Sequence, residues 1–169
     1  MPDLIESLYP RPRRAHVSPG DGPGRDTPLV VREDSSLPAE GFRIRSDAER
    51  ILVEHSDERA LRYALATLGQ ARSHPAWATS VVDLSDHPDV PVRGYMLDVS
   101  RDRVPTRETL LRYLDLAARA RLNHFELYIE HTFAYRGHEV VWQDASPFTV
   151  DDLRWFDAQC VARGIDFVP

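Results

Sequence analysis

The hydrophobic and polar positions repeat regularly in the second half of the chain. Apolar residues alternate with other residues at 95–99 and at 125–129, which predicts two strands, and "IDFV" at 165–168 predicts a third. Between these segments, apolar residues recur at helical spacing over 110–122 and again over 153–161. The order strand, helix, strand, helix, strand favours a parallel sheet with right-handed crossovers.

The first half of the chain has a different pattern. Residues 1–40 are rich in proline and glycine, and we interpret most of this segment as loop. Apolar residues at helical spacing predict one helix over 61–70. Short apolar segments of strand length lie at 29–31, 42–44, 51–53 and 81–82. This half is therefore predicted to contain both strands and a helix.

The segment "DLSDHPDVPVRG" separates the two patterns. It contains two prolines and three aspartates, which do not easily continue a helix or a strand, so we place a linker near residues 84–91. We predict two domains, 1–88 and 89–169. Three parallel strands are too few to cover the edges of a sheet, and a closed eight-stranded barrel needs about 250 residues. We therefore expect the chain to be the front portion of a larger protein.

The composition excludes several kinds of partner and of catalytic site. The net charge of −6 gives no general attraction for nucleic acid or for a membrane surface, so neither is an expected partner. All 21 basic residues other than histidine are arginines, which excludes a Schiff-base lysine and a P-loop lysine. The single cysteine, Cys160, excludes an internal disulfide framework. We expect a cytoplasmic protein because no signal peptide is visible, and secretion by another route stays open.

Several motifs, in order along the chain, resemble one enzyme family. "DVPVRGYMLDVSRDRVPT" followed by "LLRYLDLAARARLNHFELYI" is similar to the opening of the catalytic barrel in family 20 glycoside hydrolases, the β-N-acetylhexosaminidases. "TVDDLRWFDAQCVARGIDFVP" is similar to that family's next helix and strand. Upstream, "LYPRPRR" and "ILVEHSDERALRYALATLGQ" resemble the small domain that precedes the barrel. The resemblance implies an α/β protein: a zincin-like N-terminal α/β domain followed by the first three strands of a TIM (β/α)8 barrel.

The resemblance also implies a chemistry, a retaining exo-glycosidase that removes a terminal 2-acetamido sugar. In this family the acetamido oxygen of the substrate attacks the anomeric carbon, an Asp orients that amide, and a neighbouring Glu is the general acid. The Asp-Glu pair lies on the fourth barrel strand, beyond Pro169, so no catalytic residue is expected within this chain. The implied partner is a carbohydrate substrate, and no cofactor is implied. Two alternatives stay open: a non-catalytic carbohydrate-binding or interaction module, and a glycosidase of the same fold acting on a different sugar.

Three residues are candidates for substrate binding by the same resemblance. Arg93 matches a family arginine that hydrogen-bonds sugar hydroxyls; the alternative is an ion pair with Asp89 or Asp98. Typical members have His-Trp-His followed by an Asp pair, whereas this chain reads "ELYIEHTFAYRGHEVVW". Glu130 is the carboxylate nearest to those Asp positions, and His131 aligns with one of them. Both follow a barrel strand, where sugar sites form, although Glu130 as a solvated loop residue is the plainer alternative.

Three other features have structural explanations. "HEVVW" contains the first half of a zinc-protease motif, but Trp142 stands where a second His is required, so we expect no metal site. The histidines and glutamates of this segment are expected to order the connection or to line a polar pocket. Asp98 and Arg101 are expected to form an ion pair. Cys160 falls on the apolar face of its helix and is expected in the core.

Overall fold

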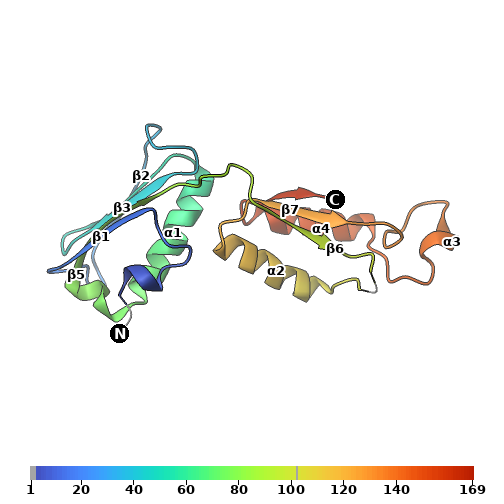
Figure 1. The fold of residues 1–169 in the computed structure, drawn as a ribbon, viewed down its shortest axis with the longest axis horizontal. Coiled ribbons are helices and arrows are strands. Elements are labelled where there is room, and N and C mark those ends of the chain that lie inside the picture. Colours follow the sequence, from blue (N-terminus) through green and yellow to red (C-terminus); the bar gives the residue numbers. More distant parts are fainter. Residues whose placement is uncertain (1–2, 102) are drawn as a thin grey trace. The chain divides into compact units, whose positions relative to one another are not determined.

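The computed structural model describes residues 3–101 and 103–169. It divides into two compact units, unit 1 (Met1–Pro91) and unit 2 (Val92–Pro169), which are both visible in Figure 1. Each unit combines a β-sheet with helices, so the chain has a mixed α/β fold. In the described part of the chain, no helix has the length and the hydropathy needed to cross a membrane.

Unit 1 is a five-stranded sheet with one long helix. The strands are β1 (Arg14–Pro19), β2 (Leu29–Glu33), β3 (Phe42–Ser46), β4 (Ile51–His55) and β5 (Ser80–Asp86). They lie in the order β1-β5-β3-β4-β2, with β2 parallel to β4 and the other neighbours antiparallel. Helix α1 (Glu58–Arg72) contacts β3 and β4. Two short 3-10 helices, η1 (Ile5–Ser7) and η2 (Pro75–Thr79), complete the unit.

The core of unit 1 lies between α1 and the sheet. The helix begins at Asp57, whose carboxylate accepts the backbone N–H of Ala60 at 2.9 Å. Ala60, Ala64 and Leu68 follow at helical spacing and are buried. They pack in one hydrophobic cluster with side chains of β3, β4 and β5, which include Phe42, Ile44, Val53 and Leu84. Burial of this apolar face stabilises the helix more than its intrinsic propensity does.

Two strands of unit 1 differ from the sequence-based expectation. β1 lies within residues 1–40, which we interpreted as loop; its terminal proline and its polar residues hide the alternation, and pairing with β5 stabilises it. β5 continues to Asp86, into the predicted linker. Asp86 is buried, and its carboxylate accepts the backbone N–H groups of Arg13 and His87, which offsets the cost of its burial. The units meet between Pro91 and Val92, whereas the predicted boundary is between residues 88 and 89.

Unit 2 is a three-stranded parallel sheet with its crossover helices. β6 (Gly94–Asp98), β7 (His124–Tyr128) and β8 (Asp166–Val168) lie in this order and pair in parallel. α2 (Arg107–Arg119) connects β6 to β7; the short α3 (Glu139–Trp142) and then α4 (Val150–Val161) connect β7 to β8. The predicted order of parallel strands and helices is confirmed.

The core of unit 2 forms where α2 and α4 pack against the sheet. Phe125 of β7 contacts Phe156 of α4 edge-on, with 5.3 Å between ring centroids. Cys160 is fully buried in the same cluster, as expected, and burial raises the pKa of its thiol to about 12. Alternate residues point to the opposite face of the sheet, where Met96 and Tyr128 are partly exposed.

Candidate functional site

The carboxyl ends of β6 and β7 meet at one edge of the unit 2 sheet. β6 ends at Asp98 and β7 ends at Tyr128, and these two residues are partners in the parallel register. The loops that follow the two strands therefore start side by side. Ligand sites of parallel α/β sheets form at this edge, because side chains from several loops converge there.

Ser100 joins the two loops. Its hydroxyl oxygen accepts the backbone N–H of Glu130 at 2.6 Å and lies 3.3 Å from the hydroxyl oxygen of Thr132. Its own N–H donates to the Asp98 carboxylate at 2.8 Å. Ser100 and Thr132 are both buried. The position of Glu130 is thus fixed through its backbone, by a hydrogen bond that does not depend on its charge.

Arg101 is the central cation of this edge. Its Nη2 lies 3.1 Å from Oε1 of Glu130 and its Nη1 lies 3.5 Å from Oδ2 of Asp98, which confirms the predicted ion pair with Asp98. Its guanidinium carbon lies 5.4 Å from the ring centroid of Tyr128, and the Tyr128 hydroxyl donates to Oε1 of Glu130 at 2.8 Å. The Tyr128 hydroxyl and the two carboxylates raise the pKa of Arg101, so the guanidinium is charged at every ordinary pH.

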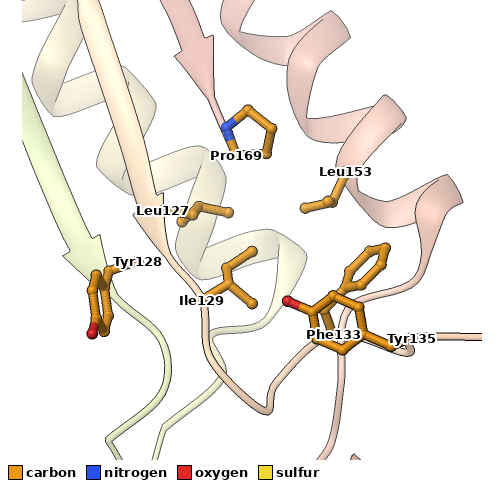
Figure 2. Close-up of a pocket in the computed structure, with 7 residues that line it drawn as sticks. All are labelled: Leu127, Tyr128, Ile129, Phe133, Tyr135, Leu153 and Pro169. Atoms are coloured by element: carbon orange, nitrogen blue, oxygen red, sulfur yellow. The ribbon is translucent and has the colours of Figure 1, made fainter. Parts of the chain in front are cut away.

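A cavity of about 360 Å³ adjoins the same edge. It is lined by residues of β7, of the following loop, of α4 and of the chain end: Leu127, Tyr128, Ile129, Phe133, Tyr135, Leu153 and Pro169. Figure 2 shows that Ile129, Phe133, Tyr135 and Leu153 gather on one side of β7, whereas Tyr128 lies on the other side, next to β6. Tyr128 therefore lies with Asp98, Arg101 and Glu130, which we call the charged cluster, more than with the other residues of the cavity.

The connection from β7 to α4 is folded onto itself. Phe133 and Phe148 form a bridge at its base, and the indole N–H of Trp142 donates to the carbonyl of Tyr135 at 2.8 Å. "HEVVW" forms only the single turn α3, where backbone hydrogen bonds, including the one from Gly137, lower the pKa of Glu139. Among the described residues, no group of three or more His, Cys, Asp or Glu side chains is arranged to hold a metal ion.

Arg93 lies at the opposite edge of the sheet from Glu130 and His131. It precedes β6, so it stands at the amino ends of the parallel strands, whereas Glu130 and His131 follow β7 at the carboxyl ends. Its side-chain Nε donates to the carbonyl of Arg121 at 2.9 Å, and its backbone N–H donates to Oδ1 of Asn123 at 2.9 Å. Arg93 therefore fastens the start of β6 to the turn before β7.

Glu130 and His131 do lie together at the carboxyl edge, with Glu130 exposed and His131 half-buried. Sequence reasoning missed two neighbours of Glu130 at this edge, Arg101 and Tyr128. A signal for Arg101 was present, because it follows β6 just as Glu130 follows β7. The signal for Tyr128 was its spacing of two residues from Glu130, which is typical of side chains on one face of an extended segment.

Comparisons with known proteins agree with this architecture. No protein-family model matches the sequence. The chain is 25% identical over 162 residues to a β-hexosaminidase of Akkermansia muciniphila, and the match covers 83% of this chain and 33% of that protein. The chain therefore spans about a third of that relative's length.

Solved structures show the same fold. A β-N-acetylhexosaminidase from Bacteroides fragilis superposes with a TM-score of 0.81 at 20% identity, covering 99% of this chain and 44% of that one. A glycoside hydrolase family 20 β-N-acetylglucosaminidase superposes with a TM-score of 0.78 at 24% identity, covering 96% and 42%. A family 20 exo-β-N-acetylglucosaminidase from Vibrio harveyi, solved with N-acetylglucosamine, gives 0.81 at 16% identity, covering 99% and 36%. The chain is thus similar over most of its length to a β-hexosaminidase and shares the fold of the matching parts of β-N-acetylhexosaminidases.

Proposed function

We propose that this chain is the front portion of a glycoside hydrolase that removes terminal N-acetylhexosamine from glycans. In this proposal, unit 1 is the small domain that precedes the barrel, and unit 2 is the first three strands of a (β/α)8 barrel. The similarity to β-hexosaminidases and the parallel βαβαβ order of unit 2 support it. The observation that carries the proposal is the Arg101–Glu130 pair at the carboxyl ends of β6 and β7.

The pair has the chemistry that a sugar ring requires. Neighbouring sugar hydroxyls each donate and accept hydrogen bonds; a guanidinium offers only donors and a carboxylate offers only acceptors. Arg101 and Glu130 are both partly exposed, so a ligand can reach them. Oε1 of Glu130 receives both the Arg101 and the Tyr128 contacts, and within residues 3–101 and 103–169 no hydrogen bond to Oε2 is found. In the proposed complex Oε2 accepts from a sugar hydroxyl.

The proposed binding set is therefore Arg101, Glu130 and His131. Charge-assisted hydrogen bonds of this kind are shorter and stronger than neutral ones, and the fixed fork of an arginine adds geometric selectivity. Arg93 is left out, because it stands at the other edge of the sheet. We propose further that the catalytic Asp-Glu pair is supplied by a later strand of the same barrel, and that hydrolysis is assisted by the acetamido group of the substrate.

The test is a substrate comparison with the longer protein that contains this chain. We expect a chromogenic β-N-acetylglucosaminide to be hydrolysed at least about 100-fold faster than the matching β-glucoside, because a site built for the acetamido group rejects a sugar that lacks it. The 169-residue chain alone should give no turnover. Equal rates on both sugars would overturn the acetamido specificity. A folded protein that binds chito-oligosaccharides without cleaving any glycoside would favour the binding module, as would a coding sequence with no later Asp-Glu pair.

A further inference from the structure

Tyr128 stands between the two charged groups of the proposed sugar site. It is the last residue of β7, and its side chain is on the face of the sheet opposite to the buried Phe125 and Leu127. Its hydroxyl donates to Oε1 of Glu130 at 2.8 Å, and its ring lies 5.4 Å from the guanidinium carbon of Arg101. One side chain thus contacts both members of the ion pair.

We infer that Tyr128 is a positioning residue, which holds Arg101 and Glu130 in the geometry that receives the sugar; the inference rests on the proposed function. An exposed ion pair between two long side chains is weak, because each loses rotamer freedom and water screens the charges. The side chains of Arg101 and Glu130 are 59% and 44% exposed, so the pair alone does not fix its own geometry.

Tyr128 supplies the missing restraint. Tyrosine has two side-chain torsions, far fewer than arginine, and its backbone is held in the β6-β7 ladder. The hydroxyl fixes one oxygen of Glu130, and the electron-rich ring face attracts the Arg101 cation. Both groups are therefore held in place before the sugar arrives, which lowers the entropy cost of binding.

The test uses the longer protein with three substitutions. Tyr128→Phe keeps the ring and removes the donor, so KM for the N-acetylglucosaminide should rise about 3- to 10-fold with kcat nearly unchanged. Tyr128→Leu removes the ring as well and should raise KM further. Tyr9→Phe, at an exposed position of unit 1, is the matched control and should leave KM unchanged. The melting temperature of Tyr128→Phe should equal that of the wild type.

A double-mutant cycle separates positioning from general stabilisation. If Tyr128 acts through Glu130, Tyr128→Phe should have no further effect on KM once Glu130→Ala has removed the acceptor. Additive effects of the two substitutions would overturn the inference, as would an unchanged KM in Tyr128→Phe. Absence of turnover in the wild-type protein would overturn the proposed function itself. This outcome is distinct from failure of the Tyr128 inference, which appears only in the Tyr128 variants. Should Tyr128→Leu fail to fold, Tyr128→Phe alone decides the question.

Discussion

The hydroxyl oxygen of Ser100 accepts the backbone N–H of Glu130 at 2.6 Å. This hydrogen bond joins the loop after β6 to the loop after β7, at the edge where the charged cluster forms. It sets where the Glu130 backbone lies before any ligand binds. The geometry of the charged cluster therefore depends on a buried serine as well as on its charged side chains.

We predict that Ser100→Ala displaces Glu130. The substitution leaves a partly buried N–H without its acceptor, so unit 2 should lose about 1 to 3 kcal/mol of stability. KM for the N-acetylglucosaminide should rise in the longer protein because Glu130 is no longer held. Ser146→Ala, at an exposed position of the same connection, is the control. A Ser100→Ala protein with wild-type KM would show that the loop is fixed by other contacts.

Arg93→Ala tests whether the amino ends of the unit 2 strands affect stability without affecting activity. Its Nε hydrogen bond to the Arg121 carbonyl is lost, and unit 2 should become about 1 kcal/mol less stable. The value of kcat/KM for the folded longer protein should not change, because Arg93 stands at the amino ends of the strands. Thermal unfolding and steady-state kinetics measure the two effects. A tenfold fall in kcat/KM at unchanged melting temperature would indicate instead that Arg93 binds the sugar.

Asp152 should make the stability of unit 2 depend on pH in the acid range. Hydrogen bonds from the Thr149 hydroxyl and from Arg107 lower the pKa of Asp152 from its ordinary 3.8 to about 2. The unfolded chain therefore takes up this proton first as pH falls. The stabilisation is complete above about pH 4 and is lost as the pH falls through about 2.

The matching variant is Asp152→Asn, which removes the charge and replaces one of the two acceptor oxygens by an amide NH2 group. At pH 6 it should be about 1 kcal/mol less stable than the wild type, and the difference should shrink at pH 2. Urea unfolding followed by the fluorescence of Trp155, with Trp77 and Trp142 replaced by Phe, reports on α4. A difference that stays constant from pH 6 to pH 2 would contradict the role assigned to the Asp152 charge.

Glu54 is a buried charged residue of unit 1. Its side chain is 4% exposed and lies between the guanidinium groups of Arg32 and Arg45. Burial raises its pKa, but the hydrogen bonds from Arg45 and Arg32 outweigh that effect and lower it overall. The ionised carboxylate is thus stabilised in the folded protein.

Removing this charge should destabilise unit 1. Glu54→Ala leaves Arg45 without the carboxylate that holds it, and we expect a loss of about 2 to 3 kcal/mol, less than for a fully buried pair because both arginines reach water. Glu33→Ala, exposed on the neighbouring strand, should cost less than about 0.5 kcal/mol. Urea unfolding followed by Trp77 fluorescence, with Trp142 and Trp155 replaced by Phe, measures both. Equal losses in the two variants would show that the burial of Glu54 is energetically unimportant.

The pattern of apolar and polar residues predicted the elements of unit 2 more completely than those of unit 1. Strands 95–99 and 125–129 show clear alternation, and "TVDD" marks a helix start that the structure shows as a capping box. β1 was missed because an edge strand held by one neighbour does not need a continuous apolar pattern. Its pairing with β5 joins residues more than 60 positions apart, which local periodicity cannot reveal.

Strand direction determines at which ends of the parallel strands each candidate residue lies. Glu130 follows β7 and lies at the carboxyl ends of the strands, whereas Arg93 precedes β6 and lies at the amino ends. This difference in position can be read from the order of the residues and the predicted strands alone. The contact of Tyr128 with Arg101 cannot, because it depends on side-chain torsions in three-dimensional packing.

The most direct test of the account is the kinetics of Arg101 variants in the longer protein. Arg101→Ala should lower kcat/KM for the N-acetylglucosaminide at least about tenfold, and Arg101→Lys should be nearly as impaired, since it keeps the charge but loses the planar fork. Arg154→Ala, an exposed arginine of α4, should leave kcat/KM unchanged. If Arg101→Ala retains the full kcat/KM while its fold is intact, the carboxyl edge of β6 and β7 does not bind the sugar.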